Sequence, residues 1–382
     1  MMTNIYNRVI VRTIKQDKRR INMSQTNFAI VGGGWRSKFY LRIARALPSQ
    51  FKVCGMVVRD ESKGQIIENK WGVSTYRNID QLLKNKNPDF VVVAVSWSAA
   101  PKIIVELAKR NIAILSETPP APDLEGLIEL YNLLQKYEAR YQVAEQYHLQ
   151  PLHAARIKIA KSGLLGEEIN QVQISVCHDY HAVSLIRKFL DIKFENVKIS
   201  AQKYESPLIA GPDFKGAPKI KERKNSEQII ATLNFGDKMA LYDFSDDHYF
   251  SWIRDLRLLI RGERGEINNK RVKYLKDYKT PIEFNLKRLN AGEDGNLEGY
   301  YLKGILAGND WAYKNPFIPG RITDDEIAIA SCLKKMSSFV EGGKRFYSFA
   351  EAAQDHYLSL LIKESINKNK TVESRRQPWA EQ

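Results

Sequence analysis

Short apolar runs alternate with amphipathic segments from residue 27 to about residue 147. The apolar runs predict strands at 28–31, 51–58, 90–95, 112–115 and 141–144. The segments between them have helical periodicity and predict helices at 38–47, 61–71, 79–86, 101–110 and 123–138. The run 90–95 is apolar at every position, which is typical of a central strand buried on both faces of a parallel sheet. Repeated βα units of this length therefore predict a doubly wound parallel sheet and an α/β fold class.

The hydrophobic pattern changes after Pro151. A helix is predicted at 152–162, and alternating segments then predict strands at 168–177, 197–204, 228–235, 239–244, 256–261 and 282–286. Most connections are too short for helical crossovers, and Gly236-Asp237 is a hairpin signal, so we expect a large, mostly antiparallel open sheet. Further helices are predicted at 297–306, 324–340 and 349–367. This second region is therefore of the α+β type.

The length of 382 residues favours two domains, since a single core rarely grows that large. We place a dinucleotide-binding domain at 27–147 and a substrate and oligomerisation domain at 148–370. Residues 1–26 carry six basic side chains and one acidic side chain without an apolar run. We expect them to be a disordered or upstream extension, with a mitochondrial-type presequence as the alternative. Residues 371–382 are polar and are expected to form a peripheral tail.

Composition narrows the possible partners. The formal charge is +15, but the 59 basic residues are mixed with 44 acidic ones, so we expect no nucleic-acid partner. A small acidic or phosphorylated ligand remains compatible with this charge. No apolar run approaches the ~20 residues of a membrane helix. The three cysteines are far apart and form no metal-binding or redox spacing, which suits a reducing cytoplasm.

Three glycines at 32–34 connect the first predicted strand to the first helix. Gly32 and Gly34 match the first two glycines of the pattern G-x-G-x-x-G, and Ser37 stands at the third position. A strand, a tight turn and a helix N-terminus direct backbone N–H groups at an anion, and the helix dipole favours a phosphate. The predicted contacts of a dinucleotide in this turn are Gly32, Gly34, Trp35, Arg36 and Ser37.

The end of the second strand bears on the choice of dinucleotide. An acidic residue there normally binds the ribose hydroxyls, but this chain has Val58 followed by Arg59. A guanidinium suits a ribose 2′-phosphate, so we prefer NADP to NAD. Asp60 would favour NAD if the strand ended later. Ser96 and Gln146 follow two further strands and complete the predicted cofactor-binding residues, since ligands bind beyond the carboxyl ends of such strands.

The order of several motifs carries a family resemblance over roughly residues 27–370. After the glycine turn and the Val-rich strand come Ser116-Glu117-Thr118-Pro119, then Pro151 with Gly163 and Gly166, then the turn 262–267. This order resembles the glucose-fructose oxidoreductase/inositol dehydrogenase (Gfo/Idh/MocA) family. The resemblance implies a Rossmann domain, a C-terminal domain with an open sheet, and a nicotinamide cofactor. It also implies a homo-oligomer, a dimer or tetramer built on that sheet, and substrates that are mostly sugars and cyclitols.

The chain departs from this family where its chemistry usually lies. The family motif at the third strand end is Glu-Lys-Pro, and its lysine hydrogen-bonds the reacting hydroxyl, but Thr118 stands at that position. The family often has an aspartate and a histidine four residues apart at the start of a helix. His181 matches the histidine, whereas Cys177 stands at the aspartate position and Ser184 replaces a later aspartate. The resemblance therefore leaves one histidine of the usual set.

Alcohol oxidation needs a group that accepts a proton near neutral pH while the hydride leaves to the nicotinamide. His181 has a suitable intrinsic pKa of ~6.5, and Asp179 or Glu117 could orient it. Tyr180 is a further proton carrier, so the predicted catalytic residues are His181, Glu117 and Tyr180, with Glu117 also near the cofactor. A capping or packed histidine is the alternative for His181. We predict no metal, since neighbouring strand residues of the group 178–181 would point to opposite faces.

These observations predict an NADP- or NAD-dependent oxidoreductase that acts on a small sugar- or polyol-like substrate. The missing lysine and aspartate leave a second hypothesis open. In that alternative the chain is a nucleotide-binding sensor or scaffold of the same fold without redox turnover.

Overall fold

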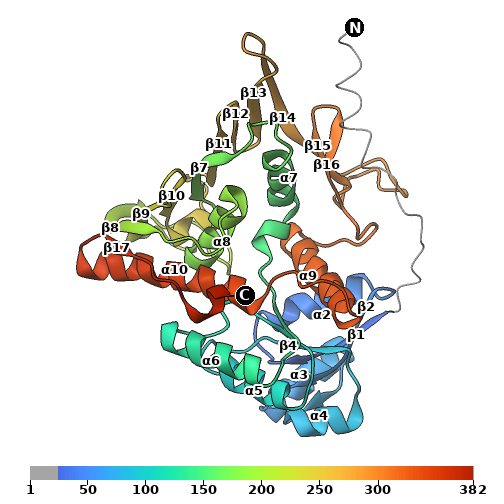
Figure 1. Ribbon diagram of the computed structural model, residues 1–382. Helices are drawn as coiled ribbons and strands as arrows, with labels where there is room; N and C mark the ends of the chain where they lie inside the picture. The colour runs from blue at the N-terminus through green and yellow to red at the C-terminus, as the bar shows by residue number, and fades with distance from the viewer. Residues whose placement is uncertain (1–24, 382) are drawn as a thin grey trace.

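The computed structural model describes residues 25–381, so the predicted extension lies almost wholly outside the described residues. The first sheet has six parallel strands in the order β3-β2-β1-β4-β5-β6. Strands β1, β2 and β4 are labelled in Figure 1. Their bounds are β1 Thr26–Val31, β2 Phe51–Val57, β3 Thr75–Tyr76, β4 Phe90–Val93, β5 Ile114–Ser116 and β6 Tyr141–Val143. The predicted doubly wound parallel sheet is confirmed.

Helices connect these strands at the predicted places. Their bounds are α2 Ser37–Ala46, α3 Glu61–Trp71, α4 Ile79–Asn85, α5 Ala100–Lys109 and α6 Leu124–Lys136. Local chemistry sets their ends. Asp60 accepts a hydrogen bond from the backbone N–H of Lys63 and so caps α3, and Gly72 ends it in a left-handed conformation.

The second sheet has eleven strands in the order β16-β15-β14-β13-β12-β11-β7-β10-β9-β8-β17. Their bounds are β7 Ile169–Ser175, β8 Lys198–Ile209, β9 Arg223–Asn234, β10 Met239–Phe244, β11 Arg257–Gly262, β12 Gly265–Asn268, β13 Arg271–Leu275, β14 Pro281–Leu289, β15 Gly304–Ala307, β16 Asp310–Lys314 and β17 Val372–Glu373. The pair β7–β10 is parallel, whereas the other pairs within the sheet are antiparallel. The predicted mostly antiparallel sheet is therefore confirmed.

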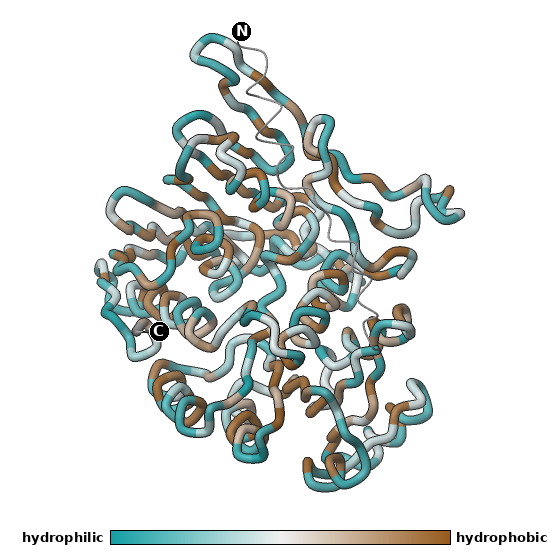
Figure 2. Tube along the Cα trace, turned by 45° about the vertical axis from the view of Figure 1, so that its right-hand side comes forward, coloured by the Kyte–Doolittle hydropathy of each residue, from teal (hydrophilic) through white to brown (hydrophobic). Residues whose placement is uncertain are grey.

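The remaining helices cover the sheets and join them. Their bounds are α7 Pro151–Ala160, α8 Asp179–Leu190, α9 Asp324–Val340 and α10 Phe349–Lys368, with short 3₁₀ turns η1 Tyr147–Leu149, η2 Asp246–Tyr249 and η3 Pro378–Glu381. Helices α8 and α10 pack against β7 and β8. Along the helices, hydrophobic and hydrophilic stretches alternate (Figure 2), as expected when one face is buried.

Helix α9 packs away from the sheet that precedes it in the sequence. It lies beside α2 in Figure 1, and its apolar residues join the core around β1 and β4. Ile327, Leu333 and Met336 are fully buried there with Phe28 and Tyr40. A segment late in the chain therefore borders the carboxyl ends of the first sheet.

The helix predicted at 297–306 is wrong. This segment is irregular until β15 begins at Gly304, and Gly295 and Gly299 adopt positive φ angles of 70° and 79°. The buried Asn296 accepts a hydrogen bond from the backbone N–H of Tyr300 at 2.9 Å. Side-chain bonds to the backbone replace the helical pattern that the apolar spacing suggested.

The tail at 371–382 is not peripheral as expected. Strand β17 pairs with β8 at the edge of the second sheet. Trp379 is fully buried, and its indole N–H donates to Gln354 Oε1 at 3.0 Å. One large aromatic side chain thus anchors a segment that is otherwise polar.

Candidate functional site

The glycine turn follows β1 and opens α2. Gly32 has a φ of +125°, and a Cβ there would lie 2.1 Å from the carbonyl oxygen of Ala94 in the neighbouring strand end. Gly34 has open space where its Cβ would stand. The buried Ser37 hydroxyl donates to the carbonyl oxygen of Gly32 at 2.9 Å and closes the turn. Gly32 is thus required by the fold, whereas Gly34 leaves room for a ligand beside the backbone.

Trp35 and Arg36 point in different directions from this turn. Trp35 is 70% exposed. The Arg36 guanidinium is almost buried, and its Nε donates to Glu117 Oε1 at 2.8 Å while Nη1 lies 3.5 Å from Asp325 Oδ2. The Tyr40 hydroxyl donates to the same Glu117 oxygen at 2.5 Å. Arg36 therefore ties the glycine turn to the end of β5 and to the start of α9.

The ends of β2 and β4 lie on either side of the turn. Arg59 is exposed directly after β2, whereas the carboxylate of Asp60 is engaged in capping α3. Arg77 donates to the carbonyl oxygen of Val58 at 2.5 Å and so braces the same strand end. Ser96 is exposed after β4. The predicted cofactor residues therefore lie at the carboxyl ends of neighbouring strands.

His181 lies in the first turn of α8 and forms the centre of a buried cluster. Its Nδ1 is 2.7 Å from Oε2 of Glu145, a fully buried residue that follows β6. The other oxygen of Glu145 accepts the backbone N–H of Tyr147 at 3.1 Å. The expectation that Asp179 or Glu117 orients His181 is corrected, because Asp179 pairs with Lys363 and Glu117 pairs with Arg36.

Burial governs the protonation of this pair. Burial raises the pKa of Glu145 to about 8, since no solvent stabilises its charged form. Burial also lowers the pKa of His181 to about 4, and the positive charge of Arg36 adds to this lowering. A neutral imidazole beside a neutral carboxylic acid is therefore the favoured state near pH 7. Two coupled sites of this kind titrate as a unit.

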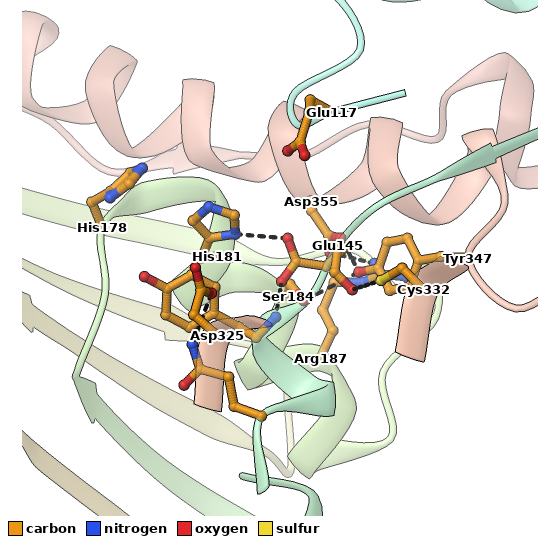
Figure 3. Close-up of polar contacts among 12 residues, drawn as sticks. Glu117, Glu145, His178, His181, Ser184, Arg187, Asp325, Cys332, Tyr347 and Asp355 are labelled. Carbon is orange, nitrogen blue, oxygen red and sulfur yellow. Dashed lines mark hydrogen bonds and ion pairs between the residues drawn. The ribbon is translucent and has the colours of Figure 1, made fainter. Parts of the chain in front are cut away.

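A second group of side chains lies behind Glu145. Ser184 opposes the effect of burial by lowering the pKa of Glu145, and the Tyr347 hydroxyl lies 3.2 Å from Ser184 Oγ. Tyr347 also donates to Asp355, whose other oxygen accepts Arg187 Nη1 at 2.5 Å. Figure 3 shows Glu145 between His181 on one side and the Tyr347–Asp355 pair on the other.

Aromatic rings enclose the other side of His181. The Tyr147 ring centroid lies 4.3 Å from that of His181, and the Tyr147 hydroxyl is 3.4 Å from the hydroxyl of Tyr249. Tyr249 in turn contacts Nδ1 of His178 at 2.5 Å. The predicted catalytic Tyr180 packs edge-on against His181, and its buried hydroxyl has no partner among residues 25–381. Tyr180 thus contacts His181 through its ring.

Uncharged residues stand at the positions where the sequence departs from the Gfo/Idh/MocA pattern. Thr118 follows Glu117 at the end of β5. Cys177 is fully buried, and burial raises the pKa of its thiol, which keeps it protonated. Gln146 is also buried, and within the described chain its Oε1 has no hydrogen-bond partner. An unpaired buried amide beside a strand end fits a ligand that carries a hydrogen-bond donor.

Sequence reasoning found His181, Arg36 and Glu117 but missed several partners. Glu145, which follows the predicted strand at 141–144, was not connected with His181. Asp325 belongs to the first turn of α9, where Thr323 forms a capping box, and this local pattern gives no sign of Arg36. Tyr347 and Asp355 come from the start of α10 and the residues before it, more than 160 positions beyond Ser184 and Arg187.

Residues 25–381 hold no group of three or more His, Cys, Asp or Glu side chains that could bind a metal ion. None of the helices in this part of the chain has the length and apolar character needed to cross a membrane.

Comparison with known proteins relates the first sheet and its helices to an oxidoreductase family. Residues 26–145 match the model of the Gfo/Idh/MocA oxidoreductase family, described as an NAD-binding Rossmann fold. An uncharacterised oxidoreductase of Schizosaccharomyces pombe is 24% identical over 147 residues, which span 37% of this chain and only 39% of that relative.

Three solved structures share the fold over nearly their whole length. A levoglucosan dehydrogenase in complex with NADH and levoglucosan has a TM-score of 0.66 and 15% identity, covering 92% of this chain and 99% of that chain. An Agrobacterium radiobacter oxidoreductase in complex with NAD+, L-tartaric acid and magnesium has a TM-score of 0.66 and 14% identity, covering 91% of this chain and 98% of that chain. The apo scyllo-inositol dehydrogenase of Lactobacillus casei has a TM-score of 0.62 and 15% identity, covering 92% of this chain and 98% of that chain.

Proposed function

Because residues 26–145 match the Gfo/Idh/MocA oxidoreductase model, we propose that the chain transfers a hydride between a nicotinamide dinucleotide and a sugar- or polyol-like substrate. One observation carries the proposal. Arg36 belongs to the glycine turn, bonds to Glu117, and its charge lowers the pKa of His181. This link supports a single site that would hold both the phosphates of the dinucleotide and the imidazole of His181. Relatives of this fold bind NAD+ or NADH with tartaric acid or levoglucosan.

The residues of the first sheet fit a dinucleotide. The backbone of Gly32 to Ser37 would hold the pyrophosphate at the N-terminus of α2, where the space at Gly34 allows close approach. The unpaired Oε1 of Gln146 would accept the N–H of a nicotinamide carboxamide. When bound, the dinucleotide supplies or accepts the hydride.

Arg59 favours NADP over NAD. Its exposed guanidinium stands at the end of β2, where it would pair with a ribose 2′-phosphate. Asp60, the alternative acceptor for the ribose hydroxyls, already accepts the backbone N–H of Lys63 at 2.8 Å. Ser96 after β4 would contact the same dinucleotide.

His181 is the acid–base residue of the proposed reaction. Its Nδ1 is engaged by Glu145, and its Nε2 makes no hydrogen bond to residues 25–381, which leaves it for a substrate hydroxyl. Arg36 supplies a fixed positive charge near His181 in a site where Thr118 cannot. Glu117 is held by Arg36 and Tyr40, so we assign it to positioning Arg36. Tyr180 and Tyr147 form the aromatic wall beside the imidazole.

The second sheet would join two copies of the chain. Helices α8 and α10 cover one of its faces, where Ala240 and Tyr242 of β10 are buried. Ile230, Leu241 and Leu259 lie on the opposite face and are only half-buried. Light scattering of the purified protein should give a dimer or tetramer, and Leu241→Lys should yield monomers. A monomeric wild-type protein would contradict this arrangement.

Calorimetry with the four nicotinamide dinucleotides tests the core of the proposal. We expect micromolar binding of NADP+ or NADPH, and the absence of binding by any of the four would refute the function. A screen of sugars, cyclitols and other polyols, followed at the nicotinamide absorbance, then identifies the substrate. Turnover that persists unchanged in His181→Ala would show that another group is the base. Binding without turnover on any compound would favour the sensor alternative.

A further inference from the structure

A second histidine, His178, stands beside His181 at the start of α8. The centroids of the two rings lie 5.1 Å apart, with an angle of 73° between the ring planes. Figure 3 shows His178 on the side of His181 opposite Glu145. Nε2 of His178 makes no hydrogen bond within residues 25–381 and is not one of their buried unpartnered atoms, so a ligand can reach it.

Two tyrosines of the second domain fix the place of His178. The hydroxyl of Tyr249 in η2 accepts the backbone N–H of His178 at 3.1 Å, and the hydroxyl of Tyr242 in β10 accepts that of Asp179 at 3.1 Å. Tyr249 itself packs edge-on against Phe244, with 5.0 Å between the ring centroids. The Tyr249 hydroxyl also lies 2.5 Å from Nδ1 of His178. The imidazole is therefore held at Nδ1, and Nε2 is the ring nitrogen left for a ligand.

The hydrogens around the Tyr249 hydroxyl decide the tautomer of His178. Its oxygen accepts two hydrogen bonds, one from the backbone N–H of His178 and one from the Tyr147 hydroxyl at 3.4 Å. A tyrosine hydroxyl has one hydrogen of its own, and within residues 25–381 the remaining atom that can accept it is Nδ1 of His178. A hydrogen on Nδ1 would give this oxygen a third donor and leave its own hydrogen without an acceptor in the chain. Tyr249 therefore donates to Nδ1, and the hydrogen of the neutral imidazole lies on Nε2.

Burial keeps both partners of this hydrogen bond neutral at pH 7. Burial lowers the pKa of His178 to about 4, and the neighbouring His181 adds to the lowering. Burial also raises the pKa of Tyr249 above its usual value, so its hydroxyl keeps the hydrogen that it donates. His178 is then a donor at Nε2 and carries no charge.

We propose that His178 binds the substrate by donating its Nε2–H to an oxygen next to the reacting hydroxyl, with Tyr249 as the positioning residue that holds this tautomer. The inference rests on the proposed function, in which Nε2 of His181 accepts the proton of the reacting hydroxyl. The two imidazoles then offer one acceptor and one donor. A vicinal diol fits this pair, because one hydroxyl donates to His181 and the neighbouring oxygen accepts from His178. A mono-alcohol leaves the donor of His178 without a partner.

Nitrogen-15 NMR of histidine-labelled full-length protein at pH 7 tests the tautomer, with His178→Gln assigning the signal among six histidines. We expect an unprotonated Nδ1 and a protonated Nε2. In Tyr249→Phe the ratio of the two tautomers should move toward Nδ1–H by about tenfold, the effect of one hydrogen bond. Tyr313→Phe is the matched control, since its buried hydroxyl has no partner within residues 25–381. A wild-type protein with hydrogen on Nδ1, or a ratio that Tyr249→Phe leaves unchanged, overturns the proposal.

Titration of the same labelled protein with cis-1,2-cyclohexanediol and with cyclohexanol, with and without NADP+, tests the contact with substrate. The diol should move the Nε2 signal of His178 and should bind about tenfold more tightly than cyclohexanol. In His178→Ala, followed at the His181 signal, the two compounds should bind equally. His178→Gln should retain part of the preference, since its amide keeps a donor. Equal binding of the two compounds by the wild type, or a His178 signal that the diol does not move, contradicts the proposal.

The outcomes separate this proposal from the proposed function. The tautomer measurement and one arm of the titration use no nucleotide, so failed dinucleotide binding with the expected results there refutes the proposed function alone. Once the screen has identified a substrate, His178→Ala should raise KM about tenfold with little change in kcat, because the contact is made equally before and during hydride transfer. Turnover with an unchanged KM in this variant refutes the role of His178 and leaves the proposed function standing.

Discussion

The glycine turn and the His181 cluster are the two halves of the proposed site, and they are built differently. The turn is formed by six consecutive residues, 32–37, and its main requirement is a backbone shape. The cluster brings Glu145 to His181 across 36 positions and Asp355 to Arg187 across 168. A phosphate site can thus be encoded locally, whereas this proton-accepting site depends on packing between distant segments. The two halves should therefore respond differently to mutation.

The largest expected effect is loss of stability in Arg187→Met. The variant leaves Asp355 charged, fully buried and without its cation, which costs about 3–5 kcal/mol of unfolding free energy. Arg261→Met removes the exposed pair with Glu266 and should cost at most about 1 kcal/mol. Urea unfolding of both variants measures the difference. Equal losses would mean that the buried Arg187–Asp355 pair does not stabilise the fold more than an exposed pair does.

Gly32→Ala tests the glycine turn, the half of the site that is encoded by consecutive residues. The added Cβ would meet the carbonyl oxygen of Ala94 at a φ that disfavours any side chain, so we expect a loss of roughly 2–4 kcal/mol. Gly34→Ala meets no atom and should leave the melting temperature unchanged. It should still weaken dinucleotide binding by about tenfold or more, because its methyl group would face the pyrophosphate. Unweakened binding in Gly34→Ala would place the pyrophosphate elsewhere.

The same contrast explains what could be predicted from the sequence. Apolar periodicity located both sheets because each strand and helix buries one face or both, and this leaves a regular pattern. The helix predicted at 297–306 was wrong. The apolar spacing of this segment resembles that of a helix, but Asn296 and two glycines of positive φ impose an irregular loop. The burial of Trp379 could not be predicted from periodicity, because a single buried side chain forms no repeating pattern.

For the site, the glycine turn and His181 were found from their local motifs. Glu145 was not connected with His181, because a strand-end carboxylate looks the same in the sequence whether it contacts solvent or a histidine. Only the packing of α8 against the residues after β6 brings the two together. That packing also creates the unusual protonation, since burial raises the pKa of Glu145. No sequence pattern reports either fact.

The pH dependence of stability tests this burial. Because the folded pKa of Glu145 is raised to about 8, the folded state binds a proton that the unfolded state has released, so stability falls as pH rises to 8. Below about pH 6.5 the lowered pKa of His181 has the opposite effect and offsets the decline. The burial-raised pKa of Asp355, about 6, adds nothing above that pH. Between pH 6.5 and 8 we therefore expect a loss of roughly 2 kcal/mol from Glu145.

Glu145→Gln isolates this contribution. Urea unfolding at pH 6.5 and pH 8 should show the decline in the wild type and little change in the variant, because glutamine does not titrate. A wild-type protein with constant stability over this interval would mean that Glu145 is already ionised at pH 6.5. The neutral state of the cluster would then be wrong.

The smallest expected effect lies at the end of β2. Arg59→Met removes the guanidinium that would pair with a 2′-phosphate, so NADP+ should bind about tenfold more weakly, roughly 1.4 kcal/mol, while NAD+ binding is unchanged. Lys70→Met, at the far end of α3, makes the same charge change and should alter neither affinity. Calorimetry with both nucleotides measures the four values. Equal weakening of both nucleotides would show that Arg59 acts only through net charge. The choice of dinucleotide would then depend on residues distant in the chain, just as the His181 cluster is assembled from distant residues.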